Sequence, residues 1–201
     1  SSRNATVWTA EPEIEAYLED YARESGCDIK RVDIENSRAK RVTISNGQGG
    51  SWNRAANTPG AILGRMGELR DYRQNNHGNG SPSRKHIPAC YLANSERVRL
   101  ELLAGLIDTD GYLARAGTPF TITQKSRLLA EQIKYLADSL GFGTSISEKM
   151  ATIKDRGYAC LVWRVNIWGD IERIPTRVPR KQAPPRKSNR SWRMTGIRIE
   201  P

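Results

Sequence analysis

The stretch Leu102–Leu113, LLAGLIDTDGYL, decides how the rest of the chain is organised. Its first part has the composition of a buried helix, because leucine and isoleucine recur on more than one helical face. Small residues lie between them, and Ala104, Gly105 and Thr109 would let a second helix approach backbone to backbone. The pattern therefore predicts a packed helix whose small residues face a partner helix.

This predicted helix ends on two carboxylates, Asp108 and Asp110, which are followed by Gly111. A helix C-terminus carries partial negative charge, so each carboxylate there costs on the order of 0.3–1 kcal/mol. Two of them favour a hard divalent cation with oxygen ligands. A plain Asp-Gly turn that closes a core helix explains the same letters equally well. In either case, Gly111 is expected in the left-handed conformation that often follows a helix.

The segment Leu103–Gly111, LAGLIDTDG, resembles the LAGLIDADG motif of homing endonucleases at all but one letter. The resemblance implies an α+β fold with two pseudo-symmetric αββαββ halves, each with a saddle-shaped antiparallel sheet. Two motif helices then pack side by side through their small residues. Asp110, the last acid of its motif, would hold catalytic Mg²⁺ together with Gly111 over the scissile phosphates. One motif helix per subunit would make a homodimer, and two in one chain a pseudo-symmetric monomer.

Composition also points to an anionic partner. The 201 residues contain 32 Lys and Arg against 22 Asp and Glu, which gives a net charge of +10. Nucleic acid is the usual partner of so basic a chain. Cys27, Cys90 and Cys160 are widely spaced and are expected to be reduced thiols of an intracellular protein. No run of 18 apolar residues occurs, so membrane insertion is not expected.

An internal repeat divides the chain. Residues 6–26, TVWTAEPEIEAYLEDYARESG, align with residues 121–141, TITQKSRLLAEQIKYLADSLG. Both copies predict the order strand, helix, strand, strand. The predicted elements are a strand at 5–9, a helix at 11–26 and strands at 28–34 and 40–45, then a strand at 118–124, a helix at 126–140 and strands at 144–149 and 159–168. A short helix at 61–72 is expected within a connecting segment at 47–80.

The repeat also sets the expected domain organisation. The motif helix precedes the first strand of the second copy, so the first copy should have its own motif helix before Ser1, absent from this chain. We expect a first half with its connection at 1–80, a linker block and second half at 81–173, and a basic Pro-rich tail at 174–201. Without the partner helix, residues 1–201 alone are expected to self-associate and to lack site-specific cleavage.

Two basic blocks resemble parts of inteins. Residues Ser83–Tyr91, SRKHIPACY, resemble the K-x-I-P block that precedes the second motif, and Lys85 matches its catalytic lysine. Such a lysine could stabilise charge that develops on a phosphate. Residues Ile174–Lys187, IPTRVPRKQAPPRK, have the composition of a linker. They also resemble the tail of yeast-type inteins, in which Lys181 would be the second catalytic lysine, with Arg180 as its rival.

The C-terminal residues indicate which protein would contain such an intein. Residues Trp192–Glu200 resemble the strand that returns into a Hint splicing domain, which would be a partner in the same precursor. Fungal inteins of a pre-mRNA-processing splicing factor are the nearest resemblance, and this host implies an intracellular, nuclear location.

The resemblance further implies that each sheet lies along the major groove of double-stranded DNA. Arg and Lys can read base edges or hold phosphates, although a solvated surface explains each one taken singly. The residues expected to face outward are Lys30, Arg31, Lys40, Arg41, Thr43, Thr121, Thr123, Lys125, Ser147, Lys149, Arg164 and Asn166.

The function implied is Mg²⁺-dependent hydrolysis of two phosphodiesters in a long, specific duplex site, by the endonuclease domain of an intein. Two alternatives stay open. One is a catalytically degenerate endonuclease that serves as a DNA-binding or structural insertion. The other is a maturase that uses the same saddle to bind intron RNA.

Overall fold

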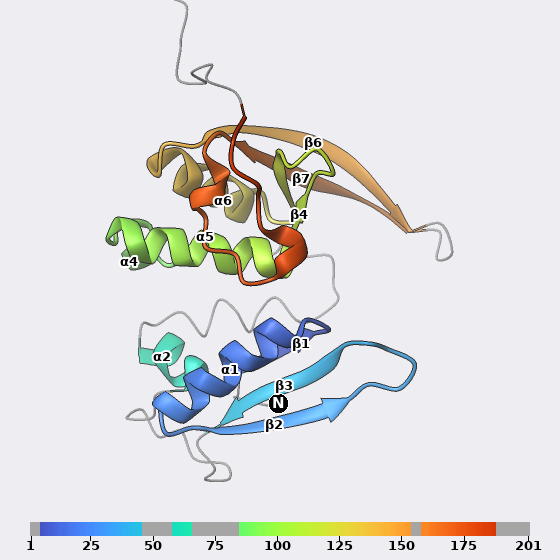
Figure 1. The fold of residues 1–201 in the computed structure, drawn as a ribbon. Coiled ribbons are helices and arrows are strands. Elements are labelled where there is room, and N and C mark those ends of the chain that lie inside the picture. The colour runs from blue at the N-terminus through green and yellow to red at the C-terminus, as the bar shows by residue number, and fades with distance from the viewer. Residues whose placement is uncertain (1–4, 46–57, 66–84, 154–157, 188–201) are drawn as a thin grey trace, which may run out of the picture. The chain divides into compact units, whose positions relative to one another are not determined.

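A computed structural model describes residues 5–45, 58–65, 85–153 and 158–187. The chain forms two compact units, Ser1–Lys85 and His86–Pro201. The first unit contains β1 (Ala5–Thr9), α1 (Pro12–Glu24), β2 (Asp28–Asp33), β3 (Lys40–Ser45) and α2 (Pro59–Arg65). The second contains α4 (Ala89–Leu92), α5 (Glu96–Asp110), β4 (Gly111–Leu113), β5 (Phe120–Gln124), α6 (Arg127–Ser139), β6 (Gly143–Ile153) and β7 (Tyr158–Trp168), then the 3₁₀ turns η2 (Ile171–Arg173) and η3 (Pro179–Lys181) (Figure 1).

The two units repeat one arrangement, as the sequence predicted. The first sheet has the strand order β1-β3-β2, and the second has β4-β5-β7-β6, with every neighbour antiparallel. Helices α1 and α6 both have 13 residues. The sequence offset that takes Pro12 to Arg127 also takes Ala5 to Phe120, so β1 and α1 correspond residue by residue to β5 and α6.

The second unit contains the complete αββαββ pattern, because α5 and β4 precede β5. Strand β4 pairs with β5 at the edge of the sheet, from Gly111 opposite Ile122 to Leu113 opposite Phe120. The sequence analysis did not predict this strand, since three residues are too few to show an alternating pattern. Among residues 5–45, the first unit contains the βαββ part of the same pattern.

The final hairpin is longer than predicted. Strands β6 and β7 each have 11 residues and form a curved arm that continues beyond the helices of the second unit (Figure 1). Met150 lies opposite Leu161 in the outer part of this arm, and both side chains are exposed. The predicted helix at 61–72 corresponds to α2, and its last residues lie outside the described ranges.

Each sheet has a helix-covered face and an outward face. In the second unit the core lies between α5, α6 and the sheet, where Leu103, Ile107, Ile122, Ile133 and Val165 are fully buried. Among the described residues, the core of the first unit includes Ile14, Ala22, Val42 and Ile44. Burial of one face leaves the alternate residues of every strand on the other face.

Local signals in the sequence set the ends of the main helices. The Ser126 hydroxyl accepts a hydrogen bond from the Leu129 amide at 3.2 Å, and Ser95 caps α5 through the Val98 amide at 3.4 Å. Gly141 follows α6 with φ +83°, a conformation that favours glycine. Among the described residues, we find no helix with the length and apolar character needed to cross a lipid bilayer.

Candidate catalytic carboxylate and nucleic-acid interface

The two carboxylates at the end of α5 have different environments. Asp108 is 3% exposed, and its carboxylate accepts hydrogen bonds from the backbone amides of Arg177 (2.8 Å) and Val178 (3.2 Å). Asp110 is exposed, and its Oδ2 accepts a hydrogen bond from Gln124 Nε2 at 2.8 Å. Asp108 therefore holds the chain beyond β7, and Asp110 is the carboxylate accessible to a cation or a substrate.

Position 111 requires glycine because a side chain would collide with the preceding helix turn, and not because of its backbone conformation. Its φ of −85° and ψ of 158° are extended, because β4 begins directly at this residue. The expected left-handed conformation is therefore wrong. A Cβ at this position would lie 2.7 Å from both the Cα and the carbonyl oxygen of Ile107, a contact that the backbone could not relieve without shifting. The glycine thus lets the strand leave the helix end closely enough to place Asp110 at the edge of the sheet.

The small residues of α5 do not all share one face. Ala104 is fully buried in the core of the second unit, so its predicted place against a partner helix is wrong. Gly105 and Thr109 are exposed, and a Cβ at Gly105 would meet nothing within 4 Å. The Thr109 hydroxyl donates to the Gly105 carbonyl at 2.9 Å, which satisfies this polar side chain within the helix.

Lys181 acts on the same helix end from the Pro-rich segment. Its side chain is 3% exposed, and Nζ donates to the carbonyl oxygens of Ile107 (2.9 Å) and Asp108 (2.7 Å). Both carbonyls belong to the last turn of α5, where backbone partners run out; the Ile107 carbonyl also accepts a hydrogen bond from the Gly111 amide. Lys181 is therefore a cap of the motif helix, whereas the neighbouring Arg180 is exposed. A catalytic role for Lys181 stays a prediction.

The block before α5 is anchored at its isoleucine. Ile87 is 3% exposed, and its amide donates to Gln132 Oε1 at 2.7 Å while its carbonyl accepts from Gln132 Nε2 at 3.2 Å. This pair of bonds ties the segment to α6. Lys85 is exposed and is the last residue of the first unit, so its role beside Asp110 stays a prediction.

The outward face of the second sheet is polar, as predicted. Thr121 and Asn166 are directly opposite, and the Thr121 hydroxyl lies 2.9 Å from Asn166 Oδ1. Asn166 Nδ2 then donates to the Ser145 hydroxyl at 3.3 Å, so this row crosses three strands. The next row contains Thr123, Arg164 and Ser147, and Lys149 lies beyond it opposite Val162. Lys125 is exposed just past the end of β5.

The first sheet has the corresponding rows. Thr6 and Thr43 are opposite, and their hydroxyls are hydrogen bonded at 3.2 Å, which repeats the Thr121–Asn166 contact. Lys30 extends this row from β2, and Arg41 lies on the same outward face between Trp8 and Val32. The predicted outward positions of Lys30, Arg41 and Thr43 are confirmed.

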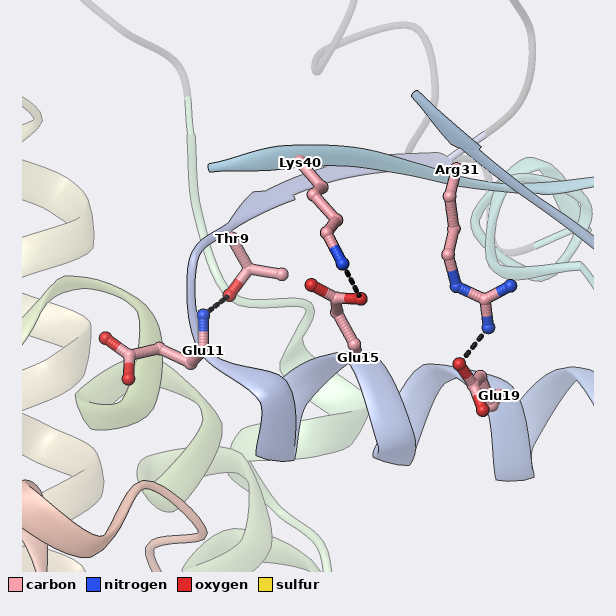
Figure 2. Close-up of polar contacts among 6 residues, drawn as sticks. All are labelled: Thr9, Glu11, Glu15, Glu19, Arg31 and Lys40. Carbon is pink, nitrogen blue, oxygen red and sulfur yellow. Dashed lines mark hydrogen bonds and ion pairs between the residues drawn. The ribbon is translucent and has the colours of Figure 1, made fainter. Parts of the chain in front are cut away.

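Two other basic residues of the first sheet were placed on the wrong face. Arg31 and Lys40 extend from their strands toward α1, where Arg31 pairs with Glu19 and Lys40 with Glu15 (Figure 2). Lys40 Nζ is 3.1 Å from the Glu15 carboxylate. These side chains connect the sheet to its helix, so their predicted place on the outward, DNA-facing surface is wrong.

The sequence analysis missed two exposed aromatic residues on the outward faces. Trp8 is 62% exposed in β1, and Tyr112 is 56% exposed in β4 opposite Thr121. The repeat alignment contained the signal for Trp8, because this residue aligns with Thr123. Tyr112 follows the motif directly, but its strand was not predicted.

Cysteine chemistry adds nothing to this site. All three cysteines are free, as predicted. Burial raises the pKa of the Cys27 thiol, and the neighbouring Asp28 carboxylate raises it further, so this group stays protonated at neutral pH. Within the described ranges, no group of three or more His, Cys, Asp or Glu residues is arranged to hold a metal ion.

Comparison with known proteins agrees with this geometry. Residues 97–173 match the family of LAGLIDADG-like domains. The crystal structure of I-DmoI in complex with DNA and Ca is similar with a TM-score of 0.50 at 12% identity, covering 82% of this chain and 68% of that chain. The chain has the LAGLIDADG homing-endonuclease fold. A second structure, of mesophilic variants from the homing endonuclease I-DmoI, also gives a TM-score of 0.50 at 12% identity, covering 82% and 73% of the two chains.

Three curated relatives have unrelated names. An iron–sulfur cluster assembly SufBD family protein of Mycobacterium leprae is 32% identical over 111 residues, 53% of this chain. The replicative DNA helicase DnaB of Mycobacterium intracellulare is 46% identical over 66 residues, 32% of this chain. The ATP-dependent DNA helicase Hel308 of Thermococcus kodakarensis is 30% identical over 133 residues, 61% of this chain. The matches cover only 13%, 11% and 12% of these proteins.

Proposed function

We propose that this LAGLIDADG chain binds double-stranded DNA along the outward faces of its two sheets and hydrolyses phosphodiester bonds with a divalent metal. One observation carries the proposal: Asp110 is an exposed carboxylate at the junction of α5 and β4, where the second sheet begins. The buried Asp108 beside it is engaged with backbone amides, so a single acid of the motif is accessible.

The donor chemistry at this point fits Mg²⁺. This ion is typically bound by one or two carboxylates together with waters and substrate phosphates, and it needs no cage of protein ligands. Asp110 would supply a carboxylate oxygen to the metal. Gly111, the next residue, would supply its backbone carbonyl oxygen. When bound, the metal would neutralise phosphate charge and activate water. Gln124 orients the Asp110 carboxylate through its 2.8 Å hydrogen bond, and Lys85 would stabilise negative charge on the phosphate.

We further infer that the chain belongs to an intein, next to a Hint splicing domain in an intracellular precursor. The support is the set of relatives, since an iron–sulfur assembly protein and two helicases each match part of this chain although their names are unrelated. Matches that cover only 11–13% of such different proteins are typical of an inserted element. Those hosts are mycobacterial and archaeal, so a fungal splicing-factor host stays a prediction.

Cleavage of a library of plasmids with random inserts would test the nuclease in a form of the chain that has a motif helix added before Ser1. In the presence of Mg²⁺, sequencing of the cut ends should recover one long recognition sequence, and EDTA should prevent its cleavage. DNA that is bound but never cut would favour the degenerate alternative. Preference for structured RNA over duplex DNA would favour the maturase.

Duplex binding is expected to weaken steeply with salt. The chain has a net charge of +10, and Lys30, Arg41, Lys149 and Arg164 lie on the two outward faces. For each phosphate neutralised, log K should fall by about 0.9 per log unit of salt concentration. Fluorescence anisotropy with a labelled duplex between low and physiological salt measures the slope. A flat dependence would show that these charges do not contact the DNA backbone.

A further inference from the structure

The two units differ at one pair of equivalent rows on their outward faces. In the second unit, Arg164 lies between Thr123 and Ser147, which are both hydroxyl residues. In the first unit, the equivalent Arg41 lies between Trp8 and Val32. The register that pairs Trp8 with Arg41 and Arg41 with Val32 places all three side chains on the outward face. The same arginine therefore has polar neighbours in one sheet and apolar neighbours in the other.

The described part of the first unit's core does not account for the tryptophan. Its side chain is 62% exposed, although indole is large and is usually well buried. Its strand neighbours Val7 and Thr9 are on the helix-covered side, opposite Val42 and Lys40. Among the described residues, no helix covers this face. An exposed aromatic residue beside an exposed arginine is the composition found at the centre of binding surfaces.

The major groove offers a group that suits this row. Guanine presents N7 and O6 to an arginine, and thymine presents an apolar C5-methyl group that favours apolar side chains. An arginine flanked by indole and valine can meet both on adjacent base pairs. The threonine and serine beside Arg164 can instead hydrogen bond either type of base.

Resting on the proposed DNA binding, we propose that Trp8 is a specificity-determining residue that selects a thymine through its C5-methyl group, next to a base pair contacted by Arg41. The equivalent row of the second unit has hydroxyl groups and less apolar surface, so its selection for a methyl group is weaker. The recognition sequence is therefore asymmetric at these two equivalent positions, with the stronger methyl-dependent selection in the half bound by the first unit.

The test uses duplexes selected from a random DNA library by the 201-residue chain. Each thymine of the selected duplex is replaced in turn by deoxyuridine, which removes only the methyl group. Loss of one buried methyl contact should weaken binding about threefold to fourfold at one position in one half of the site. The variant Trp8→Ser, whose side chain has a hydroxyl but no methyl group, should bind the thymine and uracil duplexes equally.

Tyr135→Ser is the matched control. Tyr135 is 59% exposed but lies on α6, away from the outward face, so this variant should keep the wild-type sensitivity to uracil. Uniform binding of all uracil-substituted duplexes by the wild-type chain would overturn the inference while leaving DNA binding intact. Sensitivity that persists in Trp8→Ser would also overturn it. If no duplex is enriched by the wild-type chain, the proposed function itself is wrong.

Discussion

Replacing Asp110 by asparagine is expected to abolish DNA cleavage and to leave duplex binding within about twofold of the wild-type affinity. The amide has almost the same shape as the carboxylate, and its oxygen can still accept the hydrogen bond from Gln124. What it lacks is the negative charge that a divalent cation requires. Loss of a residue that only supports a metal ligand costs about 10-fold to 100-fold, so loss of the ligand itself should cost more. Single-turnover cleavage and anisotropy on the same duplex measure the two quantities.

Asp138→Asn provides the control for this substitution. Asp138 is an exposed carboxylate on α6 that pairs with Lys134, one turn earlier in the same helix, so its loss should affect neither cleavage nor binding. Wild-type cleavage by Asp110→Asn would refute the metal assignment. Failure of that variant to bind duplex DNA would instead show that Asp110 holds the interface together.

The repeat was the most informative feature of the sequence. The two copies align without a gap from β1 through α1, and the structure confirms the predicted order strand, helix, strand, strand in both copies. Capping signals such as Ser126 placed the helix start correctly, since a cap depends only on neighbouring residues.

Which face a strand residue occupies was harder to predict. In β3 the pattern contained the answer: Lys40 alternates with Val42 and Ile44, which are buried, so it must share their face. In β2 the apolar residues Ile29 and Val32 do not alternate, and they lie on opposite faces. The position of Arg31 therefore depended on its pairing with β3, which the sequence of β2 alone does not reveal.

The role of Asp108 could not be predicted from the sequence. Its partners are backbone amides of Arg177 and Val178, which belong to a segment distant in sequence. A bond to a backbone amide leaves no requirement on the side chain at that position, so it produces no motif. The same holds for Lys181, whose acceptors are carbonyl groups of the helix end. The roles of both residues became clear only from the structure, in which the segment after β7 packs on the end of α5.

These contacts form a reciprocal clamp, in which Asp108 holds the tail and Lys181 of the tail caps the helix. Both side chains are 3% exposed. Lys181→Met keeps the length of the apolar stem but removes the Lys181 donor from the Asp108 carbonyl and leaves the Ile107 carbonyl with the Gly111 amide alone. An unsatisfied buried group costs about 1–3 kcal/mol, so we expect a loss of about 1–3 kcal/mol in the free energy of unfolding. Urea unfolding followed by circular dichroism measures it.

Arg180→Met is the matched control for this clamp, because Arg180 is the adjacent, exposed basic residue of the same 3₁₀ turn. Surface substitutions usually change stability by less than about 0.5 kcal/mol. If Lys181→Met is as mild as Arg180→Met, the clamp contributes no stability. If Lys181→Met unfolds like the wild type but cleaves DNA far more slowly, Lys181 acts in the reaction. Loss of stability together with a lower cleavage rate is the result expected when the lysine fixes the helix end that carries Asp110.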